Sequence, residues 1–349
     1  FAGRLLSEHG LRIGVEPQAR LLGEAASYQL AHRVVVRTRR DLVPLGKGVG
    51  GVVGVLRALD GELAEHCVEP AALRAWDEQF IADVEAQAKI MAGARDAAAV
   101  SRKRIELAHL VEEYRAERRR LDVVDFSDQM RFGARLAEEC PEVGAALREQ
   151  FAVVLLDEYQ DTSVAQRRLL TGLFGGGHPV TAVGDPLQAI YGWRGASVAN
   201  ITDFPVHFAP ASGGRAPVLP LAENRRSGSN VLDSANLVAA DLRALHPEVA
   251  ALVAADPDKP PGAVRLALHP TYAEEIDWLA DQVVGEIAAG TAPGDVALLV
   301  RAGSDLPPVM AALADRGVPF EVRGVDGLLA VPEVAEVLAV LDVLHDSTA

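Results

Sequence analysis

Two adjacent acidic residues, Asp157 and Glu158, follow an uninterrupted apolar run at residues 152–156. Such a run is typical of a buried parallel strand, and ligands bind at the carboxyl ends of such strands. One acid could hold Mg²⁺ beside a nucleotide phosphate, and the other could deprotonate an attacking water. Alternatively, the pair only favours the N-terminus of the following helix. For the dipeptide by itself, this second interpretation is preferred.

A second polar segment follows the next apolar run, at residues 180–183. Gln188 lies just beyond it, where an amide can hydrogen-bond a terminal phosphate and respond to its loss. Tyr191 and Trp193 flank a glycine and precede Arg194, an arrangement suited to stacking on single-stranded DNA bases and contacting a phosphate. Core packing explains most isolated aromatic pairs, but the neighbouring Gln188 and Arg194 favour the DNA interpretation.

The two segments read Asp157-Glu-Tyr-Gln-Asp-Thr162 and Val183-Gly-Asp-Pro-Leu-Gln-Ala-Ile-Tyr-Gly-Trp-Arg-Gly-Ala196. In this order and spacing they resemble the second and third motifs of superfamily 1 DNA helicases of the UvrD/Rep class. The usual family forms are D-E-[FY]-Q-D-[TS] and V-G-D-x-x-Q-[SA]-I-Y-x-[FW]-R-G-A. The resemblance implies ATP and Mg²⁺ as cofactors, with roles for these residues: Asp157 as metal ligand, Glu158 as base, Gln188 at the γ-phosphate, and Tyr191, Trp193 and Arg194 on DNA.

Residues 221–227 follow the fourth motif of the same family, usually N-Y-R-S. The resemblance assigns Arg226 to the γ-phosphate, where an arginine stabilises the charge of the phosphoryl-transfer transition state. Arg225 stands where the family usually has a tyrosine that stacks on adenine. Because a guanidinium can also stack on a base, nucleotide binding is expected to persist, while base selectivity stays open. A solvated arginine pair near a helix start is the alternative.

Other family features are weak or missing in this sequence. Residues 122–129 resemble a short L-D-F-x-D segment, although Asp125 could simply cap a helix, and Phe1–Gly10 resembles the tail of a T-x-H-[SA]-[FY] segment. The phosphate-binding pattern G-x-x-x-x-G-K-[ST] does not occur. We therefore expect that the N-terminus is an internal cut, that the fifth and sixth motifs lie beyond Ala349, and that this fragment alone is inactive.

The positioning elements are expected to alternate between strands and helices, which predicts an α/β fold with parallel sheets. Strands are predicted at 152–156, 180–183, 264–268, 296–300 and 318–322, and helices at 164–174, after the capping pair Thr271 and Glu274, after Ser304 up to Gly317, and from Pro332. Residues 70–121 are rich in good helix formers. Gly46–Gly54 reads as a loop. The basic run Arg115, Arg118, Arg119 and Arg120 favours a solvated helical face over a DNA track.

The resemblance implies RecA-like P-loop NTPase motor domains with a helical inserted subdomain. The first motor domain would comprise residues 1–23 and 116–213, the insertion residues 24–115, and a partial second motor domain residues 214–349. It also implies ATP-driven movement 3′ to 5′ on single-stranded or junction DNA, in repair or recombination.

The overall composition limits which partners and cellular locations are expected. A net charge of −15 gives no general basic footprint for nucleic acid, so DNA contacts would be local. Only Cys67 and Cys140 occur, which suits a reducing cytoplasm, and no apolar stretch is long enough to span a membrane. One alternative is the motor of a RecB-like or AdnAB-like helicase–nuclease with a second subunit. Another is a catalytically dead DNA-binding scaffold.

Overall fold

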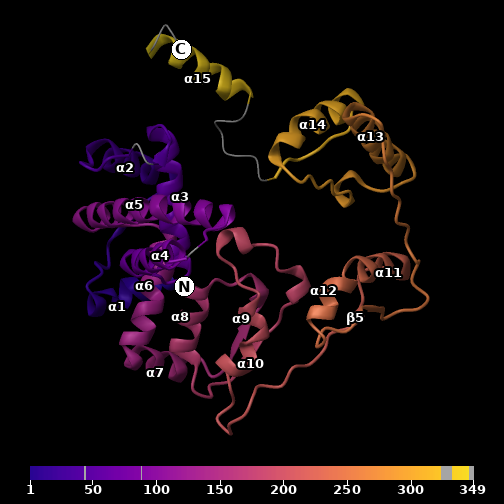
Figure 1. The fold of residues 1–349 in the computed structure, drawn as a ribbon. Helices are drawn as coiled ribbons and strands as arrows, with labels where there is room; N and C mark the ends of the chain where they lie inside the picture. Colours follow the sequence, from indigo (N-terminus) through magenta and orange to yellow (C-terminus); the bar gives the residue numbers. More distant parts are fainter. Residues whose placement is uncertain (43–44, 88, 324–331, 346–349) are drawn as a thin grey trace. The chain divides into compact units, whose positions relative to one another are not determined.

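The computed structural model describes residues 1–42, 45–87, 89–323 and 332–345. The chain divides into two compact units, Phe1–Gly262 and Ala263–Ala349 (Figure 1). The predicted combination of helices with parallel sheets is confirmed, but helices predominate, and each sheet of the described residues has only two strands. In the same residues, no helix combines the length and the apolar character needed to cross a bilayer.

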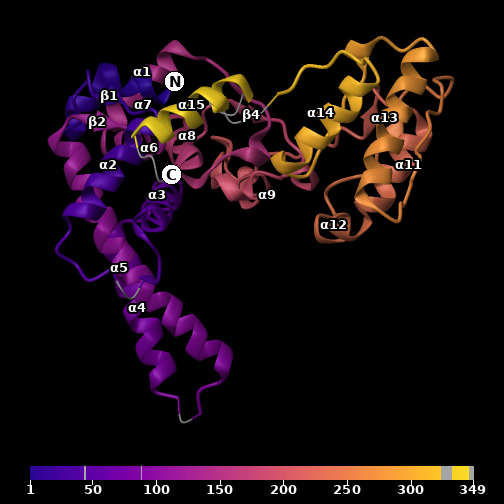
Figure 2. The ribbon, with the colours of Figure 1, turned by 90° about the horizontal axis from the view of Figure 1, so that it is seen from above.

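Helices build most of the first unit. They are α1 (Ala2–His9), α2 (Glu24–Arg37), α3 (Val49–Glu65), α4 (Pro70–Glu85), α5 (Ala92–Arg120), α6 (Phe126–Glu139), α7 (Pro141–Gln150), α8 (Val164–Phe174), α9 (Ala199–Thr202), α10 (Phe204–His207), α11 (Ser229–Val238) and α12 (Ala240–Leu245). α4 and α5 lie side by side as a long hairpin (Figure 2). The helical prediction for residues 70–121 is thus confirmed apart from the turn between these two helices.

The glycine-rich segment Gly46–Gly54 becomes helical at Val49, so the loop predicted there is wrong over most of its length. Glycine in a helix costs about 1 kcal/mol relative to alanine. Burial outweighs this cost, because Val52, Val53 and Leu56 are fully buried in a core shared with α2 and α5. Complete burial of one such side chain stabilises the fold by about 1.5–3 kcal/mol.

The strands form three short parallel pairs. They are β1 (Arg20–Leu21) with β2 (Val123–Val124), β3 (Val154–Leu156) with β4 (Val180–Ala182), and β5 (Glu223–Asn224) with β6 (Val253–Ala254). β3 and β4 confirm two predicted strands, and α8 between them confirms the predicted helix. The β1–β2 pair brings the two ends of the segment α2–α5 side by side.

The β3–β4 pair is covered on one face. Side chains that alternate along the strands, including Val154, Leu156 and Val180, contact the core formed with α1, α6, α7 and α8. Their neighbours Val153 and Leu155 are exposed. Because parallel strands end at the same edge of a sheet, the turns after β3 and β4 emerge next to each other.

Buried ion pairs join α3, α5 and α6. Asp60 of α3 accepts a hydrogen bond from Arg115 Nε at 2.6 Å and also pairs with Arg118. Arg118 pairs in addition with Asp125 and Asp128, at the start of α6. Asp60, Arg115 and Arg118 are each at most 4% exposed. We call these five residues the ion-pair junction, and it fixes the long helix α5 to the rest of the unit.

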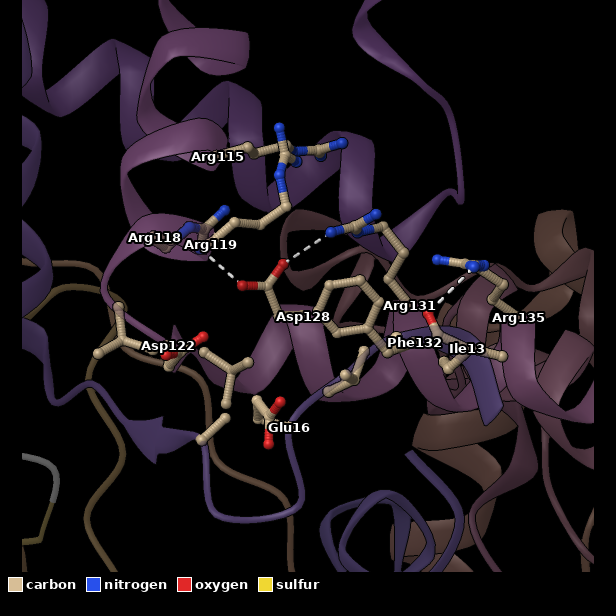
Figure 3. Close-up of a pocket in the computed structure, with 15 residues that line it drawn as sticks. Ile13, Glu16, Arg115, Arg118, Arg119, Asp122, Asp128, Arg131, Phe132 and Arg135 are labelled. Carbon is tan, nitrogen blue, oxygen red and sulfur yellow. Dashed lines mark hydrogen bonds and ion pairs between the residues drawn. The ribbon is translucent and has the colours of Figure 1, made fainter. Parts of the chain in front are cut away.

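A cavity of about 170 Å³ lies beside the ion-pair junction. Figure 3 shows Asp128 of its lining between Arg118 and Arg131. The prediction of a solvated helical face is therefore wrong for Arg115 and Arg118, although Arg119 is exposed. The reason is that Asp60, which is remote in the sequence, and two carboxylates at the start of α6 supply the charge partners that an arginine needs when buried.

Asp125 has two functions at this junction. Its carboxylate accepts a hydrogen bond from Asp128 N–H at 2.8 Å, which confirms the helix cap that the sequence allowed at this position. Burial raises the pKa of Asp125, the neighbouring Asp128 raises it further, and Arg118 lowers it. The start of α6 is thus tied electrostatically to α5.

The second unit contains α13 (Tyr272–Ala288), α14 (Leu306–Asp315) and α15 (Pro332–His345). The predicted capping pair is confirmed in part: Thr271 Oγ1 accepts from Glu274 N–H at 3.3 Å, but among the described residues no bond returns from Thr271 N–H to the Glu274 side chain. Gly317 follows α14 with φ 67°, as expected for a glycine that ends a helix. Ser304 does not cap α14, because a 3₁₀ turn at Gly303–Asp305 precedes that helix.

The strands predicted at 264–268, 296–300 and 318–322 are wrong, because none of these segments is a strand in the structure. Leu298, Val300 and Val318 do pack against α13 and α14. A strand also requires a hydrogen-bonded neighbour, and no backbone hydrogen bonds link the three segments within residues 263–323. Leu266 and Leu299 are consequently more than 90% exposed.

Candidate functional site

The turn after β3 holds Asp157 and Glu158 at the surface, where the sequence places them. Glu158 has a left-handed backbone with φ 49°, a conformation that costs a non-glycine residue about 1–3 kcal/mol. Its N–H donates to Asp157 Oδ1 at 3.0 Å, and its carbonyl accepts from Asp161 N–H at 3.0 Å. These bonds hold the two exposed carboxylates next to each other at the end of the strand.

Tyr159 anchors this turn in the core. Its side chain is fully buried, and its ring meets Phe204 and Phe208 edge to face at centroid distances of 5.3 and 6.4 Å. Burial raises the pKa of Tyr159 to about 12. Its hydroxyl has no hydrogen-bond partner among the described residues. Packing, and not hydrogen bonding, therefore holds the side chain in place.

Gln160 joins the turns after β3 and β4, a role that sequence reasoning missed. Its Nε2 donates to Glu158 Oε2 at 2.8 Å and lies 3.4 Å from Asp161 Oδ2. Its Oε1 accepts from Asp185 N–H at 3.1 Å. The side chain is only 1% exposed. The sequence shows that Gln160 lies between two acids of the same motif. It did not predict that Gln160 is buried, because glutamine is mostly a surface residue.

The turn after β4 packs tightly against Gln160. A Cβ at Gly184 would lie 2.5 Å from Gln160 Oε1 and 2.5 Å from Ile201 Cδ1, so any larger residue would displace the ends of these two side chains. Asp185 then accepts a hydrogen bond from Gln188 Nε2 at 2.8 Å. Gln188 is exposed. Its amide is therefore tethered beside the same edge of the sheet that carries Asp157 and Glu158.

Tyr191, Trp193 and Arg194 form an exposed cluster beyond this turn. The two ring centroids lie 6.4 Å apart, and the Arg194 guanidinium lies 4.5 Å from the Trp193 ring. Trp193 is 72% exposed, which excludes core packing for it. Gly195 has φ 84°, and a Cβ there would lie 2.7 Å from Glu65 Cβ on α3. The glycine thus lets the cluster's loop pass close to that helix.

Arg225 and Arg226 lie exposed on the loop after β5. Asn224 Oδ1 accepts from Arg226 N–H at 2.9 Å, and Arg225 O accepts from Lys259 Nζ at 2.8 Å. Within the described parts of the chain, no hydrogen bond or ion pair joins these arginines to the turns after β3 and β4. The structure connects the candidate residues of those two turns and does not connect the two arginines to them.

Asp157 and Glu158 offer the hard oxygen ligands that Mg²⁺ prefers. Both carboxylates are exposed, so a cation and phosphate oxygens can reach them. No group of three or more His, Cys, Asp or Glu side chains that could hold a metal is found in residues 1–42, 45–87, 89–323 and 332–345. A metal ion at Asp157 would therefore take its remaining ligands from water and phosphate, as Mg²⁺ commonly does.

Several known proteins are similar to this chain in sequence. A family model described as the UvrD/REP helicase N-terminal domain matches residues 1–209. The DNA helicase II of Rickettsia typhi is 30% identical over 236 residues, which cover 66% of this chain and 34% of that protein. The ATP-dependent DNA helicase UvrD2 of Mycobacterium bovis is 29% identical over 240 residues (68% and 33%), and the ATP-dependent DNA helicase Rep of Salmonella typhimurium is 29% identical over 279 residues (75% and 37%). The chain spans about a third of the length of these relatives.

Proposed function

Because the chain belongs to the UvrD/REP helicase family, we propose that it is part of an ATP-dependent DNA helicase that moves 3′ to 5′ on single-stranded DNA. One observation carries the proposal: the acidic turn after β3 is hydrogen-bonded, through Gln160, to the turn after β4. The second turn leads directly into the exposed aromatic cluster. A nucleotide bound at the first turn can therefore influence a DNA contact at the second. The parent protein would act in the cytoplasm, in DNA repair or recombination.

The carboxylates after β3 would act on the nucleotide. Asp157 would bind the Mg²⁺ that accompanies ATP and shields the charge of its phosphates. Glu158 would orient the attacking water and accept its proton. Gln188 would donate a hydrogen bond to the γ-phosphate. Its tether to Asp185 supports this role, because a positioned amide binds phosphate with less loss of conformational entropy.

Arg226 would approach the γ-phosphate from the segment after β5 and stabilise the charge of the transition state. Arg225 would stack on the adenine, since a planar guanidinium can cover an aromatic base. Both side chains are exposed, so both can reach a ligand. Among the described residues, they form no hydrogen bond or ion pair with the β3 and β4 turns. In this proposal, the bound nucleotide itself would link the two arginines to those turns.

Tyr191, Trp193 and Arg194 would contact DNA. Stacking of one base on an aromatic side chain contributes about 1–3 kcal/mol. The exposed ring of Trp193 provides such a surface, and the guanidinium of Arg194 lies beside it, ready for a phosphate. The preferred DNA is single-stranded, or a junction between single strand and duplex, because stacked bases inside a duplex are not accessible to these rings.

We also propose that these sites belong to RecA-like motor domains. Residues 1–23 and 116–213 would form the first, residues 24–115 a helical insertion, and residues 214–349 part of the second. The parallel pairing of β1 with β2 supports the insertion, because it places residues 20–21 beside residues 123–124. A polypeptide inserted into a domain must leave and re-enter that domain at neighbouring points.

The test is ATP hydrolysis by the complete natural protein that contains these residues, with and without single-stranded DNA, alongside a Glu158→Gln variant. We expect hydrolysis that DNA stimulates and that the substitution reduces by at least about 100-fold, as removal of a general base commonly does. Glu149→Gln is the matched control, since Glu149 is exposed on α7 and has no ion pair in the described chain; it should hydrolyse ATP normally.

Two results would contradict the proposal. Absence of hydrolysis in the unmodified protein, with DNA binding retained, would instead indicate a DNA-binding scaffold. DNA-stimulated hydrolysis that survives in Glu158→Gln would show that Glu158 is not the base.

A further inference from the structure

We propose that Gln160 is a positioning residue that holds the Glu158 carboxylate in its working orientation and couples it to Gln188. The inference rests on the proposed function, because it assigns a role relative to ATP hydrolysis. It concerns a residue that touches neither nucleotide nor DNA and acts through its neighbours.

The burial of Gln160 sets it apart from the two acids that begin the motif. Asp157 and Glu158 are exposed, whereas Gln160 is 1% exposed. A buried polar side chain stabilises a fold only when its donors and acceptors are used. Both ends of this amide are used, and both contacts lead to candidate catalytic segments. The burial therefore fixes the amide in a single orientation.

The hydrogen bonds of Gln160 have a polarity that only an amide can provide. Nε2 donates to the Glu158 carboxylate at 2.8 Å, and Oε1 accepts from the Asp185 backbone N–H at 3.1 Å. A glutamate would keep the acceptor and lose the donor, and an apolar side chain would lose both. The donor matters most, because Glu158 is exposed and would otherwise sample several rotamers.

The bonds continue beyond Asp185. Its carboxylate accepts from Gln188 Nε2 at 2.8 Å, so a chain of hydrogen bonds runs from Glu158 through Gln160 and Asp185 to Gln188. Gly184 packs directly on Gln160 Oε1, which a Cβ at residue 184 would displace. A displacement of the Gly184–Asp185 backbone, such as one caused by a change at Gln188, is therefore transmitted to the carboxylate of Glu158.

The test compares Gln160→Met and Gln160→Glu with the unmodified protein, in the complete natural protein. Methionine keeps the length of the side chain and removes both hydrogen bonds. Glutamate removes the donor and adds a buried carboxylate beside those of Glu158 and Asp161. We expect both variants to lower kcat for DNA-stimulated hydrolysis by at least about tenfold, with KM for ATP changed by less than about threefold, because Gln160 orients the base and does not contact ATP.

Gln166→Met is the matched control for a purely structural loss. Gln166 Oε1 accepts from Ser163 N–H at 2.8 Å and completes the capping box of α8. We expect this variant to lower the melting temperature without lowering kcat. It therefore separates loss of stability from loss of positioning, and Gln160→Glu remains informative if Gln160→Met does not fold.

The outcomes distinguish this inference from the proposed function. If the unmodified protein hydrolyses ATP and Glu158→Gln does not, the proposed function stands. If Gln160→Glu then keeps the kcat of the unmodified protein, the positioning role of the Gln160 donor is refuted. The same holds if the Gln160 variants show only the lowered melting temperature seen in Gln166→Met. Absence of hydrolysis in the unmodified protein would refute the proposed function itself.

Discussion

The ion-pair junction allows a quantitative prediction for Asp60→Ala. The substitution removes the carboxylate that accepts from Arg115 Nε at 2.6 Å and that also pairs with Arg118. Breaking a buried ion pair by removing one partner costs about 3–5 kcal/mol, because the remaining charge stays buried. Arg118 retains Asp125 and Asp128. We therefore expect the lower end of that range, about 3 kcal/mol.

Hydrogen exchange of the α5 amides measures this loss where it occurs. A decrease of about 3 kcal/mol in the free energy of local opening accelerates exchange roughly 100-fold, at about 1.4 kcal/mol per tenfold. The effect is large compared with the whole stability of a domain, about 5–15 kcal/mol. Amides of α13, in the second unit, should be unaffected and serve as an internal reference.

Glu85→Ala is the matched control. Glu85 of α4 pairs with Arg102 of α5, so it links the same long helix, but both side chains are more than half exposed. Exposed pairs contribute at most about 1 kcal/mol, and exchange should accelerate less than about fivefold. Equal, small effects of Asp60→Ala and Glu85→Ala would refute the reasoning, since they would mean that burial of the junction does not strengthen it.

Two further predictions concern the candidate site. Tyr159→Phe should raise the free energy of unfolding by up to about 1 kcal/mol, because it removes a buried hydroxyl that lacks a partner. Burial raises the pKa of Tyr159 from 10.0 to about 12. Ionisation of Tyr159 should therefore leave the free energy of unfolding unchanged below pH 10 and lower it between pH 10 and 12. Urea titrations should show that this loss is absent in the variant, and an unchanged pH dependence would contradict the prediction. Trp193→Ala should weaken binding of single-stranded DNA roughly 5- to 150-fold, from one lost stack of about 1–3 kcal/mol, in a fluorescence anisotropy titration. Trp76→Ala, at an exposed tryptophan on α4, is the control, and equal effects of the two would argue against the assigned DNA contact.

Local signals in the sequence predicted the elements that carry the site. The apolar runs that became β3 and β4 sit directly before Asp157 and before the Gly184–Gln188 turn, and the helix between them has a clear apolar period. The Thr271 cap of α13 was also correctly predicted. Each of these depends on residues within a few positions of one another, and for such elements propensity and tertiary packing agree.

The role of Gln160 could not be predicted from the motif alone. Its identity was fixed by the string in which it lies, but a role requires both its burial and its acceptor bond to Asp185, which is 25 positions away. The positions of Arg225 and Arg226 in the chain were equally plain. Among the described residues, no hydrogen bond or ion pair joins them to the turns after β3 and β4, so their assigned roles stay predictions.

The sequence by itself determined the family, the order of the motifs, and the strand–helix–strand unit that presents them. Only the tertiary structure decided that the glycine-rich segment at α3 is helical, that Arg115 and Arg118 are buried, and that residues 264–268 and 296–300 are not strands. The physical reason is common to all three. Burial, charge pairing and strand pairing depend on contacts with residues elsewhere in the fold. The free energy of these contacts, or their absence in the case of the missing strands, outweighs the local helix or strand propensity that a sequence pattern reports.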